Sequence, residues 1–132
     1  MILKTLACYK GQPQLLLIEI GKIKSEILNM KKKIDNLYRH NIHYEKGLDN
    51  IVEVFKERVN LYEKSVHENV TQRYLCELKS NVEQIGKQGE FLKSKISINL
   101  DKISCYKQEI KDLMHKYRQE KDKYIILTNK SQ

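Results

Sequence analysis

Two histidines are the residues whose type and spacing come closest to a chemical site. His40 and His43 lie three positions apart, so on a helix their imidazoles would share one face and could present two nitrogens to Zn²⁺. In the predicted fold, we expect no third ligand of the right type to come within a turn or two of them. The chain also shows no nucleophile paired with a base, no glycine-rich phosphate loop and no carboxylate pair at catalytic spacing. We therefore expect solvent-facing histidines, no cofactor and no enzymatic activity.

Lysine and arginine clusters are the other candidates, and they would bind an acidic partner. The net charge is +8, of which residues 1–46 contribute +5, residues 47–89 contribute −1 and residues 90–132 contribute +4. Such basic faces keep a long helix in solution, enter an acidic or polar cavity, or neutralise nucleic-acid phosphates. Asp112, Glu120 and Asp122 interrupt the bases and no nucleic-acid motif is visible, which makes nucleic acid the less favoured partner.

Two heptad repeats must position these side chains. The first runs from Leu16 to Tyr62, and 12 of its 14 a and d positions are aliphatic or aromatic. The second runs from Leu75 to Leu127, with 13 apolar residues among 16 such positions. A strict period of 3.5 residues makes a narrow apolar seam that another helix must cover. The pattern predicts a coiled coil.

The order of the repeats predicts one all-α domain over residues 1–132, two long helices forming an antiparallel coiled-coil hairpin. We expect helices over about 14–63 and 73–128 and a turn near residues 64–72, because a short connection returns the chain antiparallel. Pro13 suits the start of the first helix. The sequence Ser65-Val66-His67-Glu68 matches a capping box that would start the second, and Asn69 and Thr71 are competing N-caps.

Two asparagines in the seam set the expected register. If the numbers of two facing residues always sum to 140, Asn41 faces Asn99. The two amides can then hydrogen-bond to each other and fix the register, so we call them a register pin. The same register pairs Phe55 with Ile85, Leu48 with Leu92 and Ile51 with Gly89. In the alternatives, each asparagine meets a water, or the first helix forms a structural parallel dimer in which Asn41 faces its own copy. The hairpin predicts a monomer when the chain is isolated.

Additional apolar residues flank the seam near the predicted turn. They are Val52 and Val59 at e positions and Val54 and Leu61 at g positions. They widen the apolar stripe beyond what two helices need. Either they pack under the turn, or they form a patch that binds a second protein.

Nothing in the chain predicts membrane insertion. No segment approaches the roughly 18 consecutive apolar residues of a membrane span. Only seven residues precede Cys8, too few for a signal peptide, and the three cysteines show no paired spacing. We expect a cytoplasmic protein with reduced thiols.

Both ends of the chain resemble those of a known family. The first ten residues, Met1-Ile2-Leu3-Lys4-Thr5-Leu6-Ala7-Cys8-Tyr9-Lys10, form an apolar turn leading to basic residues. The stretch Lys116-Tyr117-Arg118-Gln119-Glu120-Lys121-Asp122-Lys123-Tyr124-Ile125-Ile126-Leu127 is a basic, Glu-containing run before an apolar end. Together with the basic hairpin pattern, they resemble the central-stalk proteins of type III secretion systems, the YscO family, and the related flagellar FliJ.

The resemblance implies a central stalk of a type III secretion system, on the cytoplasmic face of the secretion apparatus, with a function in virulence. The joined terminal end would enter a hexameric secretion ATPase and stimulate it, and the turn end would reach an export gate protein or the chaperones of secreted proteins. The residues expected to face the ATPase are Lys4, Lys10, Lys22, Lys24, Lys116, Arg118, Lys121 and Lys123. The second partner would bind the patch of Val52, Val54, Val59 and Leu61.

Overall fold

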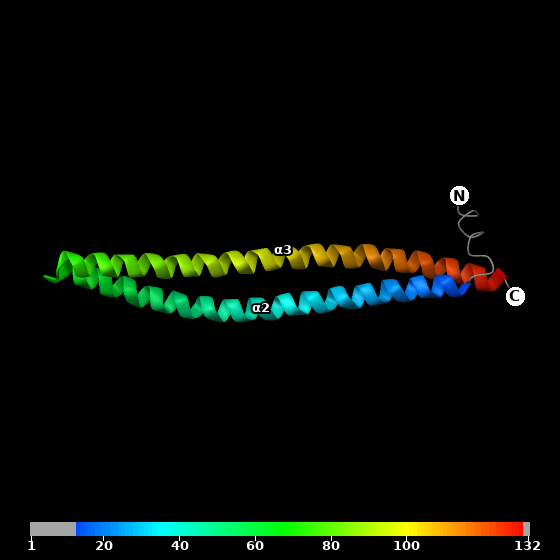
Figure 1. The fold of residues 1–132 in the computed structure, drawn as a ribbon, viewed down its shortest axis with the longest axis horizontal. Coiled ribbons are helices and arrows are strands. Elements are labelled where there is room, and N and C mark those ends of the chain that lie inside the picture. Colours follow the sequence, from blue (N-terminus) through cyan, green and yellow to red (C-terminus); the bar gives the residue numbers. More distant parts are fainter. Residues whose placement is uncertain (1–12, 131–132) are drawn as a thin grey trace. The chain divides into compact units, whose positions relative to one another are not determined.

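Two long helices make up the part of the chain that the structure, a computed structural model, describes. This part is residues 13–130, and it contains helix α2, Pro13–His67, and helix α3, Gln72–Lys130, with no strand (Figure 1). The two helices pack against each other as a helical hairpin. The predicted fold class is therefore confirmed, with a turn of four residues, 68–71, in place of the broader turn expected.

Local residues explain where each helix begins. Pro13 occupies the first position of α2, where its missing N–H and fixed φ cost nothing. Thr71 precedes α3, and its Oγ1 accepts a hydrogen bond of 3.3 Å from the Tyr74 N–H. The Thr71 carbonyl accepts the N–H of Leu75 at 3.2 Å. Thr71 is thus the N-cap of α3, one of the two alternative caps that the sequence offered.

The expected capping box at Ser65 is wrong. Ser65 lies inside α2, is 3% exposed, and occupies a d position of the first heptad repeat. Continuing the helix to His67 keeps the backbone hydrogen bonds of one more turn, and residues 68–71 then suffice to reverse the chain. The pattern of Ser followed three residues later by Glu is compatible with a helix interior as well as with a helix start.

The residues group into two compact units. Among the described residues, unit 1 contains residues 13–36 and 103–130, and unit 2 contains Leu37–Lys102 with the turn. The buried apolar side chains of unit 1 are Leu16, Ile20, Ile23, Ile34, Ile103 and Leu127. In the described part of unit 2, Leu78 is the one buried hydrophobic side chain, and the buried polar residues are Asn41, Ser65 and Asn99.

The predicted register is confirmed within unit 2. The Asn99 Nδ2 donates a hydrogen bond of 2.9 Å to the Asn41 Oδ1, and the Asn41 Nδ2 donates to the Ile96 carbonyl at 3.4 Å. A Cβ added to Gly89 would lie 3.5 Å from the Ile51 Cγ2, as a sum of 140 requires. Asn41 therefore faces Asn99 of its own chain, and the two amides bond to each other directly.

Candidate functional site

The first candidates from the sequence are the two histidines of α2. His40 and His43 are both exposed on α2, and the His43 ring lies 6.4 Å from the ring of Tyr44 beside it. Within residues 13–130, no three His, Cys, Asp or Glu side chains gather closely enough to hold a metal ion. Nothing in this region brings a third ligand to the pair.

Two of the predicted ATPase-facing lysines meet at one aromatic ring in unit 1. The Lys24 Nζ lies 5.5 Å from the centre of the Tyr117 ring, and the Lys121 Nζ lies 6.0 Å from it. The ring attracts both ammonium groups electrostatically, so it holds cations from α2 and α3 at one place. Farther along unit 1, the Lys33 Nζ lies 5.6 Å from the centre of the Tyr106 ring in the same manner.

Two other predicted lysines are paired with carboxylates. The Lys22 Nζ lies 3.4 Å from Glu19, and both side chains are open to solvent. The Lys123 Nζ lies 3.2 Å from the Oε1 of Glu120, whose side chain is only 14% exposed. Lys123 therefore partly neutralises a carboxylate at a d position of the seam, which gives this lysine a structural role in addition to any role in binding.

The remaining predicted cations are exposed or lie outside the described residues. Lys116 and Arg118 are exposed on α3, and neither forms an ion pair within residues 13–130. Lys4 and Lys10 lie outside the residues that the structure describes. Of the eight predicted positions, the structure brings Lys24 and Lys121 together at Tyr117.

Unit 1 also brings Lys22 and Lys116 to one hollow, of about 430 Å³. Its walls include the apolar side chains of Leu15 and Ile18, which are half exposed, and the carboxylate of Glu120. The surface thus combines cations, a carboxylate and aliphatic groups. Such a mixture suits a protein partner, because carboxylates beside the lysines would repel nucleic-acid phosphates.

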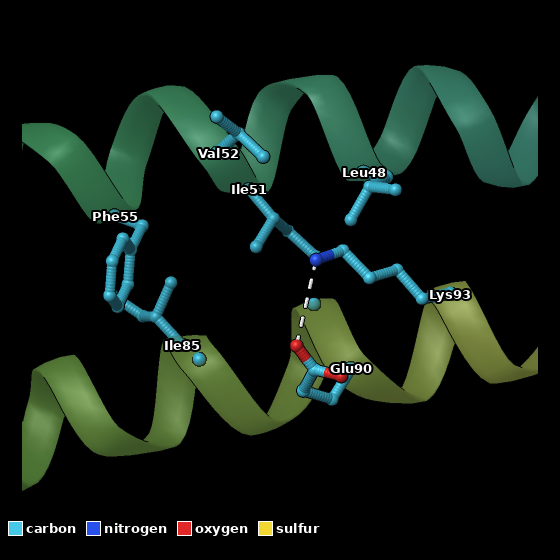
Figure 2. Close-up of a pocket in the computed structure, with 9 residues that line it drawn as sticks. Leu48, Ile51, Val52, Phe55, Ile85, Glu90 and Lys93 are labelled. Carbon is cyan, nitrogen blue, oxygen red and sulfur yellow. Dashed lines mark ion pairs between the residues drawn. The ribbon is translucent and has the colours of Figure 1, made fainter.

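The predicted apolar patch of unit 2 does not form one continuous surface. Val52 and Val54 are 40% and 41% exposed, but two residues turn a helix by about 200°, so they point to opposite sides of α2. Val59 and Leu61, which are half-buried, repeat this arrangement one heptad later. Only Val52 of the four lines the hollow that Figure 2 shows.

That hollow, called the glycine hollow below, has a volume of about 140 Å³. Figure 2 shows Leu48, Ile51 and Phe55 projecting from α2 toward α3. Ile85 projects from α3, and the ion pair of Glu90 with Lys93, 3.6 Å long, borders the hollow. The lining residues are Leu48, Ile51, Val52, Phe55, Ile85, Gly86, Gly89, Glu90 and Lys93.

The two glycines of α3 produce this hollow. Gly89 occupies an a position of the seam, and Gly86 occupies an e position beside it, so two side chains are missing on one side of α3. A Cβ at Gly86 would lie 3.6 Å from the Phe55 Cε2, and one at Gly89 would lie 3.5 Å from Ile51. Both distances are ordinary van der Waals contacts, so the empty volume follows from the missing side chains.

Sequence reasoning missed two of these features. The glycine hollow was not predicted, although the spacing of three residues between Gly86 and Gly89, opposite Phe55, was the signal for it. The meeting of Lys24 and Lys121 at Tyr117 was not predicted either, although the register of 140 pairs Tyr117 with Ile23, the residue before Lys24.

Comparisons with known proteins gave no match. No family model, no curated protein and no solved structure matches this chain. Neither α2 nor α3, as described, contains a stretch long and apolar enough to cross a membrane.

Proposed function

We propose that this protein is a non-enzymatic central stalk of a type III secretion system. In this proposal unit 1 enters the pore of a hexameric secretion ATPase and stimulates it, and unit 2 binds the export gate protein or the chaperones of secreted proteins. The resemblance of the two chain ends to the YscO family suggests this role. The helical hairpin and the uneven charge of its two units support it.

The distribution of charge is the observation that carries the proposal. The described residues of unit 1 carry 12 Lys and Arg against seven Asp and Glu, a net charge of +5. Unit 2 carries 11 against 10, a net charge of +1. A cationic unit formed by the beginning of α2 and the end of α3 has the charge to enter an acidic or polar pore. The mixed aliphatic and charged hollow of unit 1 favours protein over nucleic acid as its partner.

The test is the rate of ATP hydrolysis by the secretion ATPase encoded beside this gene, with and without the full chain. We expect stimulation by the unmodified chain and its loss when Lys24, Lys116, Arg118 and Lys121 are all changed to Glu. These four have no carboxylate partner within residues 13–130, so reversing them breaks no ion pair there. Lys123 is left unchanged because it partners the half-buried Glu120.

A matched control uses unit 2, where Lys46, Lys56, Lys79 and Lys102 are exposed. Changing these four to Glu alters the net charge by the same amount and should leave stimulation intact. Helical content by circular dichroism shows that both variants fold. Equal stimulation by both variants, or equal loss, would remove unit 1 as the ATPase-binding part of the chain. Binding of DNA with a steep dependence on salt would favour the nucleic-acid alternative instead.

A further inference from the structure

We propose that the glycine hollow of unit 2 accepts an apolar side chain from a basic amphipathic helix of a partner protein. This inference deepens the second half of the proposed function, the partner bound by unit 2, and it rests on that half only. The ATPase assignment of unit 1 can fail without affecting it.

The size of the hollow suits one side chain. Its volume is about 140 Å³, and its walls are mostly leucine, isoleucine, valine and phenylalanine. A cavity of about 150 Å³ with similar walls is large enough to hold benzene. One leucine or phenylalanine side chain therefore matches the available space. Figure 2 shows the opening between the two helices, with Phe55 at one end and Leu48 at the other.

The hairpin does not need glycine at either position. When two helices pack so closely that only glycine fits, an added Cβ meets its neighbours at less than about 3 Å; here the distances are 3.5 and 3.6 Å. Alanine would fill part of the hollow and also favour the helix, because glycine is among the weakest helix formers. The glycines therefore weaken α3 while they keep an apolar space open, and docking of an external side chain would use that space.

The surrounding apolar groups fit a helix better than an extended peptide. Val52, Phe55 and Val59 lie on α2 at positions i, i+3 and i+7, and the first two are 40% and 36% exposed. This spacing is the one by which a helix presents anchors to a neighbouring helix. A helix laid along this edge would cover Val52 and Phe55 while one of its own side chains entered the hollow.

The net negative charge beside the hollow favours a basic helix as the partner. The edge consists of the b and e positions of α2 over residues 45–63 and of α3 over residues 79–93, and its charged members are all exposed. Five are acidic and three are basic, a net charge of −2 on a chain whose net charge is +8. They are Glu45, Asp49, Glu63, Glu83, Glu90, Lys56, Lys79 and Lys93. A helix with lysines around one leucine complements the net negative charge of this edge.

The test uses two helical peptides of three heptads with one central leucine, one carrying lysines around it and the other glutamates. Each is titrated into the full chain labelled with ¹⁵N. We expect the lysine peptide to shift the amide signals of Val52, Phe55 and Gly86, and to bind at least about fivefold more tightly than the glutamate peptide at low salt. The difference should shrink at high salt.

The Gly86→Ala, Gly89→Ala double variant should bind the lysine peptide at least about tenfold more weakly, because two methyl groups occupy the hollow. Gly47→Ala is the matched control. Gly47 lies in unit 2 as well, but on α2, where an added Cβ would be 3.5 Å from the Leu92 Cδ1, and it does not line the hollow. It should change binding by less than about twofold. Melting temperatures separate a loss of binding from a loss of folding, since all these variants should melt at or above the temperature of the unmodified chain.

Three results would overturn the inference: no shifts at millimolar lysine peptide, equal binding of the two peptides, or undiminished binding by the double variant. Self-association of the unmodified chain in sedimentation experiments, abolished by the double variant, would make a second copy the occupant and overturn it as well. Stimulation of the ATPase by the double variant should be unchanged. If the unmodified chain binds the lysine peptide but does not stimulate the ATPase, only the assignment of unit 1 to the ATPase is contradicted.

Discussion

Unit 1 and unit 2 continue the same two heptad repeats, yet they bury different kinds of side chain. Within residues 13–130, six of the seven buried hydrophobic residues lie in unit 1, and all three buried polar residues lie in unit 2. The seam residues of unit 2 beside the glycine hollow, such as Ile51 and Ile85, are only half-buried. The seam of unit 1 buries apolar side chains, whereas the seam of unit 2 buries a specific amide pair and leaves apolar residues beside the glycine hollow half-buried. The same heptad pattern can therefore produce a closely packed seam in one unit and a more open seam in another.

The largest expected difference in stability is between a seam leucine of unit 1 and a seam leucine of unit 2. Leu16 is fully buried in unit 1, and Leu16→Ala should lower the free energy of unfolding by about 2–5 kcal/mol. Leu92 is half-buried in unit 2, and Leu92→Ala should lower it by about 1–1.5 kcal/mol, because less apolar area returns to water. Urea denaturation followed by circular dichroism measures both.

Leu28 offers the control for this comparison. Its side chain is 58% exposed in unit 1, so Leu28→Ala should change stability by less than about 0.5 kcal/mol. If Leu92→Ala cost as much as Leu16→Ala, the seam of unit 2 would be as tightly packed as that of unit 1. The comparison between the units would then no longer hold.

The next largest effect tests the amide pair. Asn41→Ala leaves the buried Asn99 Nδ2 without its acceptor and should cost about 1–3 kcal/mol. Asn99→Ala should cost less, since the Asn41 Nδ2 keeps its hydrogen bond to the Ile96 carbonyl. A double-mutant cycle should give a coupling energy above about 0.5 kcal/mol. A coupling near zero would mean that the two amides do not act as a register pin.

The smallest effect tests where α3 begins. Thr71→Ala removes the hydroxyl that accepts the Tyr74 N–H, and it should lower the unfolding free energy by about 0.5–1 kcal/mol. Ser65→Ala removes a hydroxyl inside α2 and should change stability by less than about 0.5 kcal/mol. The reverse order would assign the cap to Ser65 and shorten α2. Thermal denaturation of the two variants side by side distinguishes these outcomes.

Much of this fold was predictable because a heptad repeat is a local pattern with one physical meaning. An apolar residue every three or four positions requires a covering helix, and the two asparagines of the seam, Asn41 and Asn99, indicated which residues face each other. The helix limits were less predictable. The sequence at Ser65 matches a helix start, but Ser65 occupies a heptad position that lets α2 continue. A local capping motif does not indicate which of several competing residues caps the helix.

The sequence by itself determined the helices, the seam, the register and the separation of charge, because each depends on the order of residue types along the chain. Only the tertiary structure decided which side chains share a surface. It brought Lys24 and Lys121 to Tyr117, and it left a hollow where Gly86 and Gly89 face Phe55 and Ile51. These features depend on which atoms of two distant segments approach each other, and on which side chains are missing there.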